Sequence, residues 1–205
     1  MVKILIVDDH EMMREAFSKT LSAIEGYEVV AEIANASYAY AYCERLSPDL
    51  VLMDICAEDG ASGLDAAVDI CQRLPHIKVI LTTAFDEISY IPRAKEAGVH
   101  AFIYKSRSLA FFSEITQKVM NGESYFPEEK TIPFPKGEAP LTKREMEILR
   151  LLCKHMTKKE IGAELFISEN TVKYHIANML AKTGFPTAID LAFHMISNGW
   201  INPKY

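Results

Sequence analysis

The segment ILIVDDH at residues 4–10 joins four apolar residues to two aspartates and a histidine. A short apolar run that ends in polar residues is typical of a strand buried inside a parallel sheet. Four more β-rich runs follow it, separated by segments whose apolar residues recur at helical spacing. The five expected strands span residues 2–7, 28–34, 49–53, 77–82 and 100–104. This alternation predicts a five-stranded parallel sheet with helices on both faces.

The alternation ends near Asn121-Gly122, a pair that is typical of a helix end. Four of the nine prolines then fall within residues 127–140, which predicts a stiff, extended linker. The remaining segment has helical spacing throughout, with helices expected at 143–154, 158–165, 169–182 and 186–198. The predicted organisation is therefore an α/β domain at 1–122, a linker at 123–140 and an all-α domain of four helices at 141–205.

Composition excludes several classes of protein. The chain has 205 residues, 49% of them hydrophobic and 24% charged, which is the balance of a globular protein. It lacks an apolar run of 18 residues, and its first residues do not resemble a signal peptide, so we expect a cytoplasmic protein without a membrane partner. The four cysteines have no metal-binding spacing, and we interpret them as free thiols.

Charge is distributed unevenly along the chain. Residues 1–135 carry 12 Lys and Arg against 21 Asp and Glu, whereas residues 136–205 carry 10 against 7. An acidic first part and a mildly basic second part indicate two domains with different partners.

Polar side chains gather where the predicted strands end. Asp8 and Asp9 follow the first strand, Asp54 the third, Thr83 the fourth and Lys105 the fifth. The carboxyl ends of parallel strands meet at one edge of a sheet, where ligands bind. One aspartate after a strand is often only a helix N-cap, but three carboxylates repel each other strongly unless a cation joins them. Carboxylate oxygens suit Mg²⁺ as ligands, with Mn²⁺ as an alternative. A lysine beside them suits a bound phosphoryl group.

These residues carry a resemblance to a known family. The motifs ILIVDDH (4–10), LVLMDI (50–55), ILTTAF (80–85), AGVHAF (97–102) and YKS (104–106) resemble the receiver domain of bacterial two-component response regulators. The resemblance implies a flavodoxin-like sheet of order 2-1-3-4-5.

The same resemblance implies a role for each residue of the pocket. Asp54 would accept a phosphoryl group from a sensor histidine kinase. Asp9, Asp54 and the backbone carbonyl of Cys56 would bind Mg²⁺, with Asp8 acting through a water. Lys105 would contact the phosphoryl group, while Thr83 and Phe102 would change position with it.

The sequence departs from this family at two places. Glu58 replaces the proline usual four residues after the phosphoacceptor, and Asp59 adds a further negative charge. Pro92 falls inside the expected fourth helix, so that helix either begins late, with Pro92 at its first position, or is kinked.

The basic segment carries a second resemblance. Residues 141–185 contain KKEIG (158–162) followed by SENTVKYH (168–175), and they resemble a LuxR-type helix-turn-helix domain. Ser168 is a good N-cap for the third helix, on which Val172 and Ile176 lie on the core face. A small helical bundle with exposed lysines is the plainer interpretation, but the ordered motif argues against it. The resemblance implies that Lys173, Tyr174 and Ala177 meet base edges of double-stranded DNA, with phosphates near Thr171, His175, Lys158, Lys159 and Lys182.

Together the two resemblances imply a transcriptional response regulator of the NarL/FixJ type. Because the net charge of the basic segment is low for tight binding by a monomer, we expect it to bind DNA as a homodimer. The sequence leaves three alternatives for the dimer surface: the receiver's first and fifth helices, its fourth and fifth helices, or the last helix of the chain. An alternative is an atypical regulator that acts through protein partners without phosphorylation.

We do not expect an enzyme beyond the receiver's own phosphoryl chemistry. An aspartate-nucleophile phosphatase would need an Asp-x-Asp motif, and Cys56 stands two residues after Asp54. A flavin protein would need a hydroxyl-rich loop after the first strand.

Overall fold

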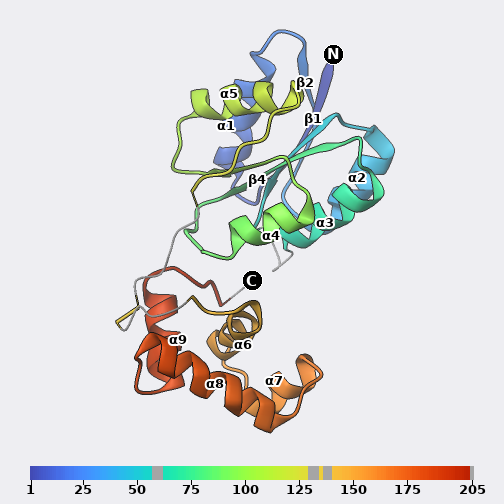
Figure 1. The fold of residues 1–205 in the computed structure, drawn as a ribbon. Coiled ribbons are helices and arrows are strands. Elements are labelled where there is room, and N and C mark those ends of the chain that lie inside the picture. Colours follow the sequence, from blue (N-terminus) through green and yellow to red (C-terminus); the bar gives the residue numbers. More distant parts are fainter. Residues whose placement is uncertain (57–61, 129–133, 136–139, 204–205) are drawn as a thin grey trace. The chain divides into compact units, whose positions relative to one another are not determined.

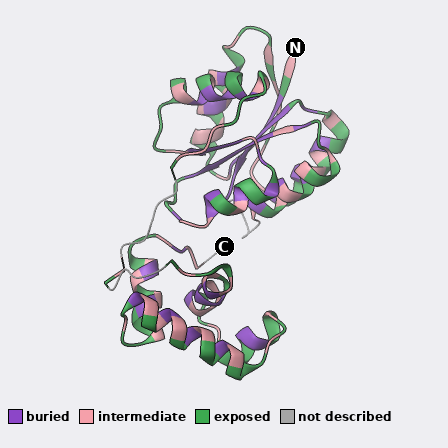
Figure 2. Ribbon diagram, in the orientation of Figure 1, coloured by how far each residue is buried: buried purple, intermediate pink, exposed green. Residues whose placement is uncertain are grey.

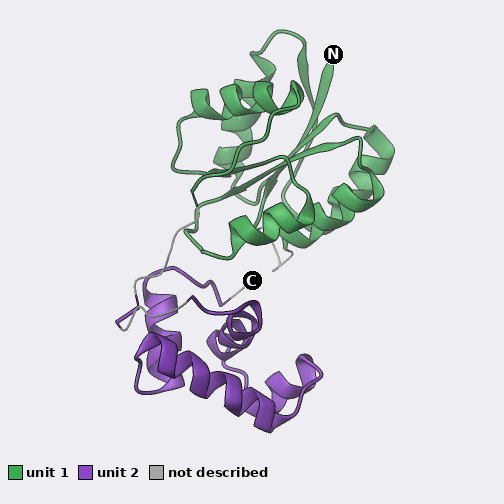
Figure 3. Ribbon diagram, in the orientation of Figure 1, with its two compact units in different colours: residues 1–129, 205 green, residues 130–204 purple. Residues whose placement is uncertain are grey.

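The computed structural model describes residues 1–56, 62–128, 134–135 and 140–203. The chain forms two compact units, residues 1–129 and residues 130–204 (Figure 3). The first unit is α/β and the second is all-α (Figure 1), so the predicted fold classes are confirmed. No helix formed by the described residues is long and apolar enough to cross a bilayer.

The first unit is built on one parallel sheet of five strands. Their order is β2-β1-β3-β4-β5, as the resemblance implied. The strands are β1 (Val2–Val7), β2 (Tyr27–Ile33), β3 (Leu50–Asp54), β4 (Lys78–Thr83) and β5 (Ala101–Tyr104). In the register, Val7 lies beside Met53 and Asp54 beside Thr82, so the polar residues that follow these strands share one edge of the sheet.

Helices cover both faces of this sheet (Figure 1). One face carries α1 (Glu11–Ser22) and α5 (Leu109–Met120), and the other carries α2 (Ala39–Leu46), α3 (Gly63–Arg73) and α4 (Tyr90–Ala97). A single turn of 3₁₀ helix at Ala36–Tyr38 precedes α2.

Strand periodicity explains why two separate cores form. Ile4 and Ile6 of β1 pack with α1 and α5, whereas Leu5 and Val7 pack against the opposite layer. All four residues are fully buried, as the purple central strands of Figure 2 show.

The fourth helix begins late, as one of the two readings of Pro92 predicted. It starts at Tyr90 and Pro92 is its third residue, not its first. A proline in the first turn removes no helical hydrogen bond, because the N–H groups there have no partner within the helix.

The packed chain of the first unit continues beyond residue 122, where the sequence placed the start of the linker. The N–H of Tyr125 donates to the carbonyl of His100, and the N–H of Phe102 donates to the carbonyl of Tyr125 at 2.8 Å. Tyr125 packs on the α1–α5 side of the sheet and Phe126 on the other side. Residues 123–126 therefore form a strap along the free edge of β5. The sequence prediction of a linker from residue 123 rested on the prolines and did not anticipate that Tyr125 and Phe126 pack against the sheet.

The second unit contains α6 (Lys143–Cys153), α7 (Lys158–Glu164), α8 (Glu169–Thr183) and α9 (Ala188–Ser197). Each helix begins at a hydroxyl N-cap, and Thr142 and Thr157 form complete capping boxes with Glu145 and Glu160. Its core contains these buried apolar residues, most of them from the four helices: Ile148, Leu149, Cys153, Ile161, Val172, Ile176, Met179, Leu191, Met195 and Ile201.

Candidate functional site

A buried ion cluster lies at the carboxyl edge of the sheet. Lys105 Nζ is 2.7 Å from Asp8 Oδ2 and 2.8 Å from Asp54 Oδ2. Asp8 is 1% exposed and Asp54 is 2% exposed, and the Lys105 side chain is almost as deeply buried. The structure therefore brings together three of the residues that the sequence assigned to one pocket.

The electrostatics of this pocket leave a shortage of positive charge. Burial raises the pKa of Asp54 to about 6, although the nearby Lys105 ammonium opposes the shift. Burial would lower the pKa of Lys105, but Asp54 and Asp8 outweigh it and hold that pKa above its usual value. One ammonium is thus shared by two buried carboxylates, with Asp9 beside them.

The donor set fits a hard divalent cation. Ligand atoms of Asp8, Asp9, His10 and Asp54 all lie within 4.8 Å of one another. Asp54 Oδ1 is buried and has no hydrogen-bond partner among the described residues. Carboxylate oxygens are the ligands that Mg²⁺ prefers, and a cation would supply the charge that the pocket lacks.

The two expected switch residues lie close to the pocket and are fully buried. Thr83 ends β4, and its Oγ1 accepts a hydrogen bond from the N–H of Phe85 at 3.1 Å. Phe102 lies in β5, with its ring edge-on to Tyr104 at a centroid distance of 5.3 Å.

Cys56 is the last described residue before the gap at 57–61. It is buried, and its Sγ lies 3.7 Å from the hydroxyl of Tyr90 on α4. The role of its backbone carbonyl as a metal ligand stays a prediction. Glu58 and Asp59, the two unusual acidic residues, lie outside the described residues.

A second candidate site lies on α8. Val172, Ile176 and Met179 face the core, while Lys173, Tyr174 and Ala177 are exposed on another side of the same helix. Tyr174 is 65% exposed, which is a large exposed fraction for an aromatic residue, and its ring lies edge-on to the neighbouring His175 ring at a centroid distance of 5.8 Å. Thr171 and His175 are half-buried, and Thr171 Oγ1 lies 2.8 Å from the Ser168 hydroxyl.

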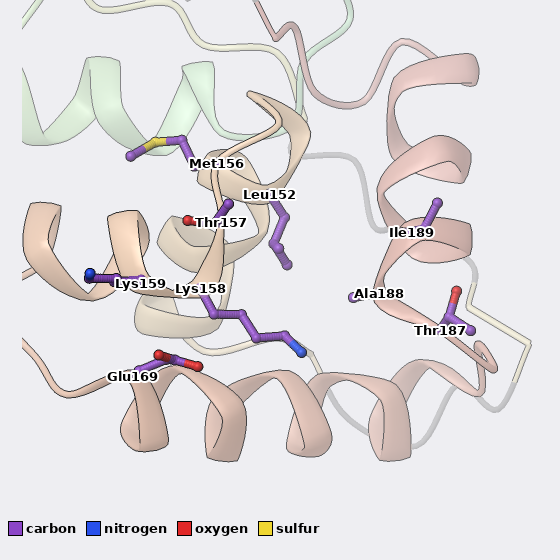
Figure 4. Close-up of a pocket in the computed structure, with 9 residues that line it drawn as sticks. All are labelled: Leu152, Met156, Thr157, Lys158, Lys159, Glu169, Thr187, Ala188 and Ile189. Atoms are coloured by element: carbon purple, nitrogen blue, oxygen red, sulfur yellow. The ribbon is translucent and has the colours of Figure 1, made fainter.

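Lys158 and Lys159 stand beside a groove of about 530 Å³ where α7, α8 and α9 begin (Figure 4). Leu152, Ile189 and Glu169 also line it. Lys182 is placed differently, because its Nζ lies 2.7 Å from the buried carboxylate of Glu145. The expected phosphate contact is thus engaged in an ion pair inside the unit.

Comparison with known proteins identifies the family. Residues 4–117 match the family model for a response regulator receiver domain, and residues 139–195 match that for bacterial regulatory proteins of the luxR family. The chain is 40% identical over 188 residues to the response regulator protein VraR of Staphylococcus aureus (strain Mu3 / ATCC 700698). That alignment covers 88% of this chain and 90% of VraR. The chain belongs to the response-regulator family.

Solved structures agree with this assignment. A two-component response regulator of the LuxR family from Aurantimonas sp. SI85-9A1 is 28% identical, with a TM-score of 0.58 over 62% of this regulator and 89% of that chain. RcsB from Salmonella enterica serovar Typhimurium, bound to promoter rprA, has a TM-score of 0.65 over 97% of this regulator and 100% of RcsB, at 20% identity. The second match supports the fold alone. This chain is a response regulator with a receiver domain and a LuxR-type DNA-binding domain, and it acts in transcriptional regulation within a two-component system.

The sequence reasoning missed one residue of the regulator's pocket. His10 Nδ1 lies 2.7 Å from Asp9 Oδ1 and 3.6 Å from Asp8 Oδ1. Its position directly after two pocket aspartates was the available signal, but the sequence does not fix the direction of a side chain at the N-cap of a helix.

The raised pKa of Asp54 predicts a measurable effect on stability. Its carboxyl binds a proton more tightly in the folded than in the unfolded chain, so its contribution to stability falls as pH rises from about 4 to about 6. Asp54→Asn removes this loss of stability, because the Asn side chain stays neutral and the ion pair between Lys105 and Asp8 is retained. We expect the receiver of the variant to be more stable than the wild type at pH 7 without divalent ions, by on the order of 3 kcal/mol.

Urea unfolding between pH 4 and pH 7 measures this difference. Asp69→Asn is the matched control, because the ion pair that Asp69 forms with Arg73 is exposed to solvent on both sides. If the difference in the free energy of unfolding between Asp54→Asn and the wild type did not increase with pH, the raised pKa of Asp54 would not be its cause.

Proposed function

We propose that this response regulator is switched by phosphorylation of Asp54 by a sensor histidine kinase, with Mg²⁺ bound in the same pocket, and that the switch controls binding to double-stranded DNA. The observation that carries the proposal is the buried cluster of Asp8, Asp54 and Lys105, which holds more negative than positive charge. A regulator that binds DNA and receives its signal from a kinase would work in the cytoplasm.

The chemistry follows from the positions of these side chains. A carboxylate oxygen of Asp54 would attack the phosphorus of the donor; a P–O bond forms and the bond from phosphorus to the leaving group breaks. Lys105 already lies 2.8 Å from Asp54 and would offer its ammonium to the new phosphoryl oxygens. The reaction takes place on the chain's own aspartate, so we propose a phosphoacceptor and not an enzyme with a separate substrate.

Asp9, Asp54 and the Cys56 carbonyl would hold Mg²⁺, with Asp8 acting through a water. The metal ion, when bound, supplies positive charge that offsets the repulsion between the carboxylates and an incoming phosphoryl group. Mn²⁺ offers the same chemistry with similar ligands.

The phosphorylated state would be read by Thr83 and Phe102. A new charge of about −2 offers the Thr83 hydroxyl hydrogen an acceptor, and a movement of Oγ1 toward it would break the hydrogen bond that Oγ1 now accepts from the N–H of Phe85. Phe102 is buried against Tyr104, so a shift at the end of β4 would require this ring to repack.

On the DNA side, Lys173, Tyr174 and Ala177 would meet base edges, because they share the exposed side of a well-capped helix. Thr171, His175, Lys158, Lys159 and Lys182 would lie near phosphates, and Lys182 would first have to leave Glu145. We propose a homodimer on two half-sites. A solved structure described as two RcsB dimers bound to two parallel DNAs supports this arrangement by analogy.

A DNA-binding experiment tests the proposal as a whole. Selection from a random duplex library with phosphorylated protein would yield a binding sequence, whose affinity is then measured by mobility shift with and without prior phosphorylation. We expect phosphorylation to raise the affinity about tenfold or more. The double variant Lys173→Ala/Tyr174→Ala should lose about 2 kcal/mol or more of binding free energy, because it removes two base-facing side chains.

Lys19→Ala is the control for the double variant, since it also removes one positive charge but from an exposed position in the receiver. Equal affinity before and after phosphorylation would favour the alternative regulator that acts without phosphorylation through protein partners. Equal affinity of the double variant and the wild type would contradict the role assigned to α8.

A further inference from the structure

His10 stands at the entrance of the pocket and belongs to it by geometry. It is the N-cap residue of α1, and its backbone N–H donates to Asp8 Oδ1 at 3.0 Å. Its ring nitrogen Nδ1 contacts Asp9 Oδ1 at 2.7 Å and is also within 3.6 Å of Asp8 Oδ1. The side chain is 67% exposed, so this contact is made from the solvent side of the pocket.

The imidazole changes the chemical character of the donor set. Asp8, Asp9 and Asp54 offer only hard carboxylate oxygens, which favour Mg²⁺. The His10 nitrogen lies within 4.8 Å of ligand atoms of all three. A borderline nitrogen donor adds affinity for later divalent ions such as Co²⁺ and adds little for Mg²⁺, which rarely accepts imidazole.

The pocket is prepared for a cation independently of His10. Asp54 Oδ1 is buried and lacks a hydrogen-bond partner among the described residues, while Lys105 is already occupied by Asp8 and by the other oxygen of Asp54. Nδ1 points at the two aspartates on the open side of this pocket. A cation that bridges the carboxylates would therefore meet an imidazole nitrogen next to them.

We propose that His10 is a further metal ligand of this receiver and determines which divalent ion it prefers. The proposal rests on the proposed function, because it assumes that Asp54 and its neighbours hold a divalent cation. With His10 as a ligand, the site also binds divalent ions that prefer nitrogen ligands, such as Co²⁺. The fraction of the regulator that holds a cation then depends on the concentration of these ions as well as on that of Mg²⁺. The competing explanation is an ordinary surface contact between a histidine and an aspartate, which contributes little to any affinity.

Calorimetric titration of the unphosphorylated full chain distinguishes the two explanations. Mg²⁺ and Co²⁺ are titrated separately into the wild type and into His10→Gln, which keeps a polar side chain but removes the imidazole. We expect the variant to bind Co²⁺ about tenfold more weakly or worse, and Mg²⁺ within about twofold of the wild type. The visible absorption of bound Co²⁺ should also change, because a nitrogen ligand is lost.

Two control variants locate the effect. His76→Gln removes an exposed histidine at the opposite end of β4 and should leave both affinities unchanged. Asp54→Asn should weaken both ions, which shows that they bind in this pocket and not at the cysteines.

The outcomes separate this inference from the proposed function. An equal Co²⁺ affinity in His10→Gln and the wild type overturns the role of His10, and so does a wild type whose Co²⁺ binding is insensitive to Asp54→Asn. A wild type that binds no Mg²⁺ overturns the proposed magnesium site instead, whatever the Co²⁺ result.

Discussion

Asp54→Asn is expected to take up no phosphoryl group under conditions in which the wild type takes up one. The Asn side chain keeps the shape of Asp54 and its place beside Lys105, but its amide oxygen is too weak a nucleophile to form a stable bond to phosphorus. Incubation with Mg²⁺ and acetyl phosphate, followed by intact-mass measurement, gives a direct reading. The expected effect is a complete loss, which makes this the sharpest test of the pocket.

The control for this experiment is again Asp69→Asn on α3, which removes an exposed carboxylate and should be phosphorylated like the wild type. A phosphoryl group on Asp54→Asn would contradict the assignment, and peptide mapping would then show whether Asp9 or a hydroxyl had accepted it. If the wild type takes up phosphate from neither acetyl phosphate nor a cognate kinase, the receiver acts as a protein-interaction module.

Gly63→Ala is expected to destabilise the receiver strongly. A Cβ at Gly63 would lie 1.8 Å from the carbonyl oxygen of Asp54 and 3.1 Å from Met53 Cγ. Both neighbours belong to the end of β3, so the backbone that positions the phosphoacceptor would have to move. We expect a loss of about 3 kcal/mol or more in the free energy of unfolding, and a drop of roughly 10 °C or more in the receiver's melting temperature.

Thermal unfolding followed by circular dichroism measures this loss. Gly26→Ala is the matched control, because a Cβ there meets nothing within 4 Å and only the positive φ of +83° is unfavourable. Its cost should be about 1 kcal/mol. Equal melting temperatures for the two variants would mean that the close approach of α3 to β3 is relieved without disturbing the site.

Regular periodicity explains how much of the fold was predictable. The apolar runs that contain Ile4–Val7 and Leu50–Met53 are short and end in aspartates, which favours buried strands, and they form neighbouring strands of the parallel sheet. Helix starts in the second unit were predictable as well, because hydroxyl caps such as Ser168 act locally. The pocket residues Asp8, Asp54 and Lys105 were predictable because each one follows or ends a strand.

Features that depend on long-range partners were not predictable. Lys182 reads as one more exposed lysine, and only the folded unit places it 2.7 Å from Glu145, 37 residues earlier in the chain. The exact start of α4 depended on the packing of Tyr90, which is fully buried beside Cys56. His10 was missed for a related reason, since its ring direction is decided by the turn that begins α1.

The strap at residues 123–126 has a consequence for anyone who isolates the receiver. Its carbonyl at Tyr125 satisfies the N–H of Phe102, and its two aromatic rings close both sides of the sheet at β5. A receiver cut after residue 122 would present β5 as a bare edge strand, ready to pair with another chain and aggregate. A receiver that ends at Glu128 retains this cover, and self-association of the shorter fragment would reflect the cut and not the regulator's own dimer.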